Sequence, residues 1–423
     1  FCALIRDNEK NAIIALSSTV GTPKRSPAST IKPLLVYAPA LEENLICPAT
    51  PVLDEKTDFG GYSPDDYGGA SGEYMSVRYA LSRSVNIPAV KLLNEIGIAR
   101  GTEYLERMGL KVEDSDKSLA LALGGMRDGF TLLQLADGYA TFAEGGQYSP
   151  AQTISCVKDG NGRTLYDHNI RRKKIFSEDV CWLMNDMLQT AAKEGTAKRL
   201  KVLPFPICAK TGTAGTDEGN TDAYCIAYTK DHVVAVWMGN EDYSTTNITG
   251  GGLPANEVLR ISRTLYNGRT PAPFPQCAGV TQLHFDKTAY EQEHVIELSD
   301  PAAPPLNDPA EYFRTCALPM QSSTRFSSPS IKMPEIQVKN NAVNIILCQT
   351  EYYDYEIIRE NRGKKTTIYN GKYQKTICDN SVKAGETYVY TIIPKYLEHR
   401  GTPVVLPSVT IEKREDIPDH WWE

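Results

Sequence analysis

Residues 26–33 read S-P-A-S-T-I-K-P and hold a serine and a lysine three positions apart, Ser29 and Lys32. The apolar sequence from Ser29 through Leu41 predicts a helix. On a helix, residues i and i+3 share one face with Cβ atoms about 5–6 Å apart, so Lys32 can reach the Ser29 hydroxyl. Serine becomes a nucleophile when a base removes its proton. A lysine can be that base if burial or a second cation lowers its pKa.

The S-x-x-K pattern also occurs at Ser155 and Lys158, in a predicted strand before the turn D-G-N-G at 159–162. In a strand, residues i and i+3 point to opposite faces, so Lys158 cannot serve Ser155. The helical setting of Ser29 therefore distinguishes it from a chance match.

Two further short patterns follow along the chain. Ser84-Val85-Asn86 comes 55 residues after Ser29, before a predicted helix, where serine and asparagine are common as caps. Lys210-Thr211-Gly212-Thr213 begins 126 residues after Ser84, in a predicted strand. A glycine inside a strand weakens it and often marks the close approach of a ligand. In this order, on helix, loop and strand, the three patterns form a specific signature, closely related to that of β-lactamases and penicillin-binding proteins.

With these motifs the chain resembles the transpeptidase domain of class A penicillin-binding proteins, over roughly residues 1–268. Ala28 stands where glycine is commoner in that family. The resemblance implies an α+β fold, a penicillin-binding transpeptidase or serine β-lactamase-like domain with a central antiparallel sheet flanked by helices. The other stretches that carry it are Y-S-P-D-D-Y-G-G (62–69), S-V-R-Y-A-L-S-R-S-V-N-I-P-A-V-K-L-L (76–93), A-L-G-G-M-R-D-G-F-T-L-L-Q-L-A-D-G-Y-A-T-F-A-E-G-G (122–146), E-G-T-A-K-R-L (194–200), C-A-K-T-G-T (208–213), T-D-A-Y-C-I-A-Y-T (221–229) and V-W-M-G-N-E-D (236–242).

The resemblance also implies a D,D-transpeptidase reaction and its catalytic residues. Ser29 would attack the carbonyl of the penultimate D-Ala of a peptidoglycan stem peptide. Lys32 would take its proton, kept neutral by burial and by the charge of Lys210. Ser84 would pass a proton to the departing D-Ala, and Asn86 would hydrogen-bond the substrate amide and Lys32. β-Lactams would be covalent inhibitors of this acyl-enzyme chemistry.

The third motif would bind the substrate. The hydroxyl groups of Thr211 and Thr213, which flank Gly212, would hold the terminal carboxylate together with Lys210. The backbone N–H groups of Ser29 and Thr213 would form the oxyanion hole. No metal and no cofactor are expected.

The remaining chain predicts two more regions. Residues 269–331 are rich in proline and serine and predict a linker. Residues 332–423 contain short strand-like runs separated by turns, which predict a small β-sandwich. Within it, A-G-E-T-Y at 384–388 resembles the tyrosine corner of fibronectin type III-like domains. We expect this accessory domain to bind cell-wall or divisome partners.

The charge, the cysteines and the histidines of the chain disfavour several classes of function. The net charge of −7 disfavours a nucleic-acid partner. No run approaches the roughly 18 apolar residues that span a membrane. The resemblance implies an extracytoplasmic protein anchored through a segment upstream of residue 1. The ten cysteines contain no C-x-x-C pair, which disfavours a zinc site, and none of the six histidines lies near the motifs, which disfavours a Ser-His-Asp hydrolase.

Three alternatives remain open from the sequence. A D,D-carboxypeptidase would use the same motifs with water as acceptor. A β-lactam-hydrolysing or β-lactam-sensing relative shares the site, but the E-x-x-L-N pattern of class A β-lactamases is absent. A non-catalytic cell-wall scaffold would keep the fold, although intact motifs argue against it. Labelling by penicillin discriminates these classes.

Overall fold

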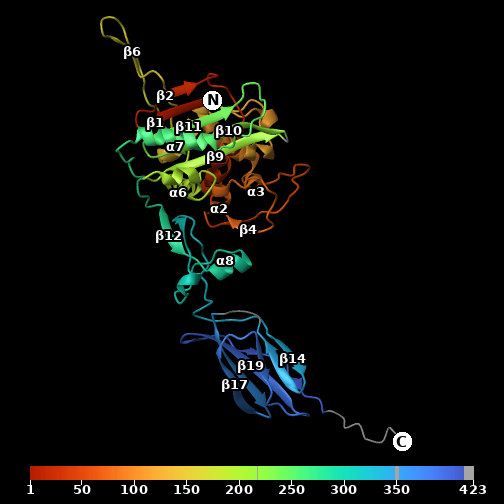
Figure 1. Ribbon diagram of the computed structural model, residues 1–423. Coiled ribbons are helices and arrows are strands. Elements are labelled where there is room, and N and C mark those ends of the chain that lie inside the picture. The colour runs from red at the N-terminus through yellow and green to blue at the C-terminus, as the bar shows by residue number, and fades with distance from the viewer. Residues whose placement is uncertain (217, 348–351, 414–423) are drawn as a thin grey trace. The chain divides into compact units, whose positions relative to one another are not determined.

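The structure is a computed structural model that describes residues 1–216, 218–347 and 352–413 (Figure 1). The chain divides into two compact units. Unit 1 comprises Phe1–Leu283 and Glu311–Leu318, and unit 2 comprises His284–Ala310 and Pro319–Glu423. None of the helices in the described part of the chain combines the length and apolar sequence that crossing a membrane requires.

Unit 1 is built on a five-stranded antiparallel sheet, seen edge-on among the helices in Figure 1. Its strand order is β2 (Ala12–Ser18), β1 (Cys2–Asp7), β11 (His232–Gly239), β10 (Gly219–Tyr228) and β9 (Cys208–Thr216). The predicted central antiparallel sheet is therefore confirmed. The sequence from Phe205 to Thr213 predicts the strand that carries Lys210, whereas β9 begins at Cys208, beyond Pro206, because proline lacks the N–H that a ladder needs.

Both faces of this sheet are buried, and the strands alternate between them. In β11, Val233, Ala235 and Trp237 face one core, while Val234 and Val236 face the other. The first core contains η2, α3, α5 and α6, and the second contains α7. This arrangement confirms the α+β fold with helices flanking the sheet.

The helices of unit 1 are of several kinds. Its α-helices are α1 (Ala38–Glu42), α2 (Val77–Arg83), α3 (Asn86–Ile96), α4 (Ile98–Arg107), α5 (Leu132–Ala143), α6 (Glu178–Lys193) and α7 (Leu253–Leu265). The short 3-10 and π segments are η1 (Ala28–Ile31), η2 (Pro33–Tyr37), η3 (Asp114–Asp116), η4 (Leu119–Leu123) and η5 (Lys198–Val202). Three small two-stranded pairs complete the unit: β3 (Pro51–Leu53) with β4 (Tyr74–Ser76), β5 (Gln147–Tyr148) with β8 (Lys173–Lys174), and β6 (Cys156–Lys158) with β7 (Thr164–Asp167).

The region predicted as a linker, residues 269–331, contains regular structure. Its elements are β12 (Val280–His284), α8 (Lys287–Glu293), η6 (Pro305–Asn307) and β13 (Ala310–Arg314), and β12 pairs with β13. Both units draw residues from this region. The predicted domain boundaries at 268 and 331 remain predictions.

Unit 2 contains two antiparallel sheets that share one core. The first is β14 (Glu335–Lys339), β15 (Ala342–Ile346) and β18 (Thr376–Asp379). The second is β17 (Lys364–Lys372), β16 (Asp354–Asn361), β19 (Thr387–Tyr396) and β20 (His399–Arg400), with β21 (Val404–Val405) and β22 (Val409–Thr410) also on β19. Val343 and Ile377 of one sheet belong to the same buried cluster as Ile357 and Ile392 of the other. These sheets therefore form a sandwich.

The sequence resemblance of unit 2 to a fibronectin type III domain remains a prediction. Its tyrosine corner has one matching feature, because the Tyr388 hydroxyl accepts a hydrogen bond from the Lys383 N–H at 2.9 Å.

A buried ion pair connects the segment before Ser29 to the central sheet. The Arg25 Nε and the Asp222 Oδ1 are 2.7 Å apart, and both side chains are almost fully buried. Asp222 also accepts from the Trp237 indole at 2.9 Å, while the Arg25 guanidinium stacks on Tyr243. The backbone N–H of Arg25 donates to Phe130. This ion pair therefore fixes the chain four residues ahead of the nucleophile candidate.

Removing Asp222 should destabilise unit 1 strongly. In Asp222→Ala, the Arg25 charge stays buried without its partner, so the free energy of unfolding should fall by about 3–5 kcal/mol in a denaturant titration. The control is Glu257→Ala, which breaks an exposed pair with Arg260 and should change it by about 0–1 kcal/mol. Equal effects of the two variants would contradict a stabilising role for the buried pair.

Candidate active site

The nucleophile segment is helical, but not α-helical at its start. Ser29 lies in the 3-10 helix η1, and the π-helix η2 and α1 follow. Pro33 has no N–H to donate to the Ser29 carbonyl, and the Lys32 N–H takes that acceptor in a 3-10 bond instead. Three residues per turn place Ser29 and Lys32 on the same side. Ser29 is half-buried, whereas Lys32 is fully buried.

The second motif joins two helices. Ser84 ends α2 with φ of +62°, in the left-handed region, and α3 begins at Asn86. A non-glycine residue in this region is strained and persists where surrounding contacts hold it. The Ser84 Oγ accepts from Lys210 at 2.7 Å, and the Ser84 carbonyl accepts from Lys32 at 2.8 Å. The strained turn therefore presents one residue to both lysines.

The third motif lies on β9, the edge strand of the central sheet. Lys210 is fully buried, and its Nζ also donates to the Thr211 carbonyl at 2.8 Å. The Thr211 hydroxyl donates to Thr196 at 2.6 Å. Thr213 is exposed, and its hydroxyl oxygen accepts from the Gly250 N–H at 3.1 Å. This contact uses the hydroxyl oxygen of Thr213 as an acceptor, so the hydroxyl can still donate its proton to a bound carboxylate.

Gly212 allows β9 to approach the nucleophile segment. A Cβ at this position would lie 2.9 Å from Thr30 Cγ2 and 3.1 Å from the Pro27 carbonyl oxygen. Contacts this short require the neighbours to move. The absence of a side chain therefore sets the separation between the strand and η1. The sequence suggested the close approach of a ligand at this glycine, whereas the structure shows that of the protein's own nucleophile segment.

Lys32 connects the first motif to the second. Its Nζ donates to the carbonyl oxygens of Ser84 and Val85 at 2.8 and 3.0 Å, and to Asn86 Oδ1 at 2.7 Å. Through Ser84 the network continues to Lys210. The structure thus brings together Ser29, Lys32, Ser84, Asn86, Lys210, Thr211, Gly212 and Thr213.

The model of the penicillin binding protein transpeptidase domain matches residues 2–260. The chain belongs to this family. It is 38% identical to penicillin-binding protein 1F of Bacillus subtilis over 221 residues, which is 52% of this chain and 30% of that protein. It is 30% identical to penicillin-binding protein 2a of Streptococcus pneumoniae over 274 residues, 63% of this chain and 36% of that protein. The chain thus spans well under half the length of these relatives.

Solved structures show the same fold. Penicillin-binding protein 1A from Haemophilus influenzae matches with a TM-score of 0.63 at 20% identity, covering 76% of this chain and 54% of that one. PonA1 from Mycobacterium tuberculosis, solved in complex with penicillin V, matches with a TM-score of 0.57 at 19% identity, covering 65% of this chain and 80% of that one.

In this penicillin-binding fold, burial shifts both site lysines toward their neutral forms. Burial lowers the pKa of Lys32 well below its ordinary value, the charge of Lys210 lowers it further, and Asp66 opposes the shift. Burial lowers the pKa of Lys210 to about 7. Two neighbouring ammonium groups repel each other in a site with little water, so the pair favours one neutral amine.

Lys32 contacts Asn86, as the resemblance implied, but its amino group does not hydrogen-bond to Ser29 as the i, i+3 spacing suggested. Within the described residues, no hydrogen bond joins its Nζ to the Ser29 hydroxyl, and the three acceptors are carbonyl groups. An ammonium has three N–H donors, which fits this set. A neutral amine has two, so neutral Lys32 releases one carbonyl and frees a lone pair. Hydrogen bonds of catalytic groups are often long before substrate binds.

Sequence reasoning missed two residues that support the motifs. Thr196 binds the Thr211 hydroxyl, and Asp66 accepts from the backbone of Asn86. Both fall in stretches that resemble the family, E-G-T-A-K-R-L and Y-S-P-D-D-Y-G-G. Neither residue could be recognised from the sequence, because each hydrogen-bonds to a motif residue that is distant along the chain.

The second S-x-x-K pattern lies outside the site. Ser155 and Lys158 are exposed on the β6–β7 hairpin, which projects from unit 1 in Figure 1. Lys158 therefore lacks the burial that Lys32 has. Elsewhere in residues 1–216, 218–347 and 352–413, no group of three or more His, Cys, Asp or Glu side chains could hold a metal ion.

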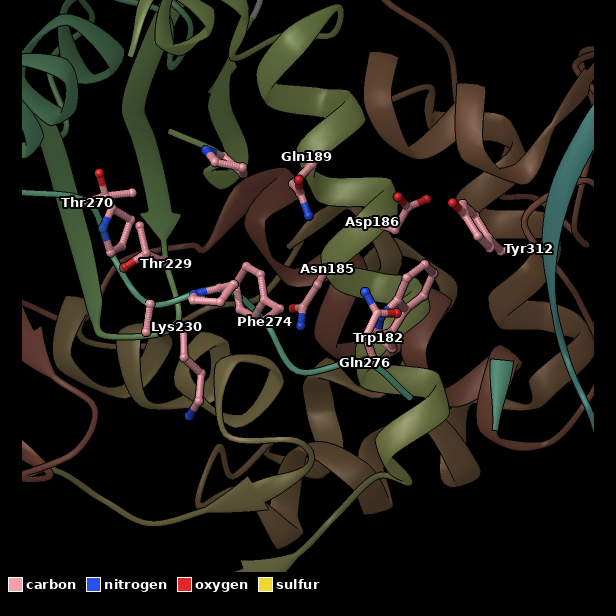
Figure 2. Close-up of a pocket in the computed structure, with 14 residues that line it drawn as sticks. Trp182, Asn185, Asp186, Gln189, Thr229, Lys230, Thr270, Phe274, Gln276 and Tyr312 are labelled. Atoms are coloured by element: carbon pink, nitrogen blue, oxygen red, sulfur yellow. The ribbon is translucent and has the colours of Figure 1, made fainter. Parts of the chain in front are cut away.

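A separate cavity of about 400 Å³ lies in unit 1 between α6 and the segment that begins at Thr270 (Figure 2). None of its lining residues belongs to the three motifs. Three of its polar side chains already have protein partners: Asn185 accepts from Tyr228, Lys230 pairs with Glu144, and Asp186 pairs with Arg78. We assign no part of the reaction to it.

Gly212→Ala should slow the reaction with penicillin. The new Cβ would push β9 away from η1, and a misplacement near 1 Å can lower a rate by about 100-fold. The rate of labelling by a fluorescent penicillin measures this effect, with the thermal midpoint reporting folding. Gly160→Ala is the control, because a Cβ there meets nothing within 4 Å. Labelling of Gly212→Ala at the rate of Gly160→Ala would contradict the close approach.

Proposed function

We propose that this chain is a serine D,D-transpeptidase that cross-links peptidoglycan stem peptides. The observation that carries the proposal is the continuous hydrogen-bonded network from Lys32 through Ser84 to Lys210, beside an accessible Ser29. The network joins the three motifs of the family to which the chain belongs.

The first half-reaction acylates Ser29. Neutral Lys32 takes the hydroxyl proton as Ser29 Oγ bonds to the carbonyl carbon of the penultimate D-Ala. The N–H groups of Ser29 and Thr213 stabilise the oxyanion that develops. The proton then passes through Ser84, which Lys210 orients, to the nitrogen of the terminal D-Ala. The C–N bond breaks and D-Ala leaves.

The second half-reaction transfers the acyl group. An amine of another stem peptide attacks the ester carbon, a C–N bond forms, and the bond to Ser29 Oγ breaks. The amine proton returns through the same groups to Ser29. Asn86 orients the acyl chain. The exposed Thr213 hydroxyl and Lys210 bind the carboxylate of the donor stem, with the Thr211 hydroxyl available if it leaves Thr196. β-Lactams would follow the first half-reaction and stop at the ester.

The family match favours transpeptidation over the alternatives. A carboxypeptidase would use water in the second half-reaction, a β-lactamase would hydrolyse the drug ester, and a scaffold would form no ester. We propose in addition that the protein acts outside the cytoplasmic membrane, where stem peptides are joined, and that it is anchored upstream of residue 1. Unit 2 would bind cell-wall or divisome partners through its sandwich.

Intact-protein mass after incubation with benzylpenicillin tests the nucleophile. Wild type should gain one lasting adduct, Ser29→Ala should gain none, and Ser155→Ala should match wild type, because the lysine of the Ser29 motif, Lys32, is buried and that of the Ser155 motif, Lys158, is exposed. An adduct on Ser29→Ala, or its loss in Ser155→Ala, would contradict the assignment. Drug turnover without an adduct would indicate a β-lactamase. Dimer formation from a donor peptide and an acceptor amine separates transpeptidation from release of D-Ala to water.

A further inference from the structure

A pair of carboxyl groups lies beneath the second motif, in the segment between β3 and β4. Asp54 begins this segment and is 2% exposed. Its Oδ2 accepts from the backbone N–H and the hydroxyl of Ser71 at 2.8 and 2.7 Å, and its carbonyl accepts from the Gly72 N–H. The hydrogen bonds of Asp54 therefore hold together the start and the end of the segment that contains Asp66.

Asp66 contacts the start of α3. Its Oδ1 accepts from the N–H groups of Asn86 and Ile87, which have no partner inside the helix. The neighbouring Asp65 carbonyl accepts from Asn86 Nδ2 at 2.8 Å. The segment thus holds Asn86 by its main chain and by its side-chain amide. The remaining side-chain atom, Oδ1, accepts from Lys32 at 2.7 Å.

The other oxygens of the two carboxyl groups have no hydrogen-bond donor in the described residues. These oxygens, Asp54 Oδ1 and Asp66 Oδ2, are both buried. The two side chains are within hydrogen-bonding reach of each other. Two carboxylates in such contact repel, and one proton between them satisfies both oxygens. Burial and Asp54 raise the pKa of Asp66 to about 6, so Asp66 takes up this proton below about pH 6 and is negatively charged above it.

Several charged or titratable groups surround this pair. Lys32 and Tyr37 on the nucleophile segment both respond to the Asp66 charge. Lys91 on α3 lies near Asp54, and Lys210 on β9 lies near Lys32. The Tyr37 hydroxyl is buried without a hydrogen-bond partner in the described residues, and burial raises the pKa of Tyr37, so it stays neutral. Lys32 is therefore the catalytic group that the Asp66 charge influences.

We propose that Asp66 is a positioning residue of this site, which orients Asn86 toward Lys32 and, when charged, acts on Lys32 across that contact. This inference rests on the proposed function, because it assigns Lys32 the role of base. A neutral Asp66 keeps both backbone hydrogen bonds through Oδ1 and removes the negative charge. A substitution that removes the charge of Asp66 but keeps its hydrogen bonds can therefore distinguish the effect of charge from the effect of geometry.

The test compares rates of acylation by benzylpenicillin for full-length variants between about pH 5 and pH 9. In Asp66→Asn, the amide oxygen can accept the same two N–H groups and the amide nitrogen can donate to Asp54. The pKa of Lys32 should then fall, and the rise of the rate with pH should move to lower pH. In Asp66→Ala, α3 loses both hydrogen bonds, and the rate should fall by about 10- to 100-fold. Asp58→Asn is the control, because it removes one charge from an exposed position of the same segment.

The possible results distinguish a failure of this inference from a failure of the proposed function. Equal pH profiles for Asp66→Asn and Asp58→Asn would overturn the charge effect, and wild-type rates in Asp66→Ala would overturn the positioning effect. If Asp66→Ala fails to fold, as its thermal midpoint would report, the profile of Asp66→Asn still decides. Wild type that forms no adduct at all would instead refute the proposed function, and this inference with it.

Discussion

The site depends on the burial of two lysine amino groups next to each other. Lys32 and Lys210 are both removed from water, and Ser84 hydrogen-bonds to both. Burial of an ammonium group is unfavourable, so the folded protein binds protons at these positions more weakly than the unfolded chain. Stability associated with such a group is lowest at pH values below its folded pKa. It increases as the pH rises toward the ordinary lysine value. The fold therefore gives up some stability at neutral pH to hold a lysine that can accept a proton.

The rest of unit 1 keeps this pair in place. The three motifs come from different elements, and each element has one local feature that positions its motif. Pro33 favours the 3-10 turn under Ser29, the left-handed conformation of Ser84 directs it to both lysines, and Gly212 lets β9 approach. The Arg25–Asp222 ion pair fixes the approach to the nucleophile from the sheet side. These local departures from regular helix and strand geometry therefore position the site residues next to a regular sheet.

Much of this could be predicted from the sequence, because some of the signals are local. The i, i+3 spacing places Ser29 and Lys32 on one face whether the turn is α or 3-10. The resemblance implied a central antiparallel sheet flanked by helices, which the structure contains. The exposed position of Ser155 agrees with its strand setting. Pro206 was a readable signal for the start of β9, and the prediction overlooked it.

The resemblance implied the contact of Lys32 with Asn86, but its hydrogen bonds to the carbonyl oxygens of Ser84 and Val85 could not be predicted, because they depend on contacts between distant parts of the chain. Its three acceptors lie more than 50 residues away, and their direction depends on the left-handed φ of Ser84. The role of Asp66 is hidden for the same reason, since one carboxylate among 52 acidic residues carries no mark of its contacts. The regular structure within 269–331 was also missed, because prolines there outweigh the short strand and helix patterns.

The central claim is that the site holds a lysine that is neutral near physiological pH. A titration followed by NMR of lysine labelled with 13C at Cε, with Lys32→Arg and Lys210→Arg used for assignment, measures this directly. The account predicts two resonances that titrate far below the ordinary value of 10.5, with that of Lys210 near 7. Titration of every lysine in the folded protein near its ordinary value would contradict it.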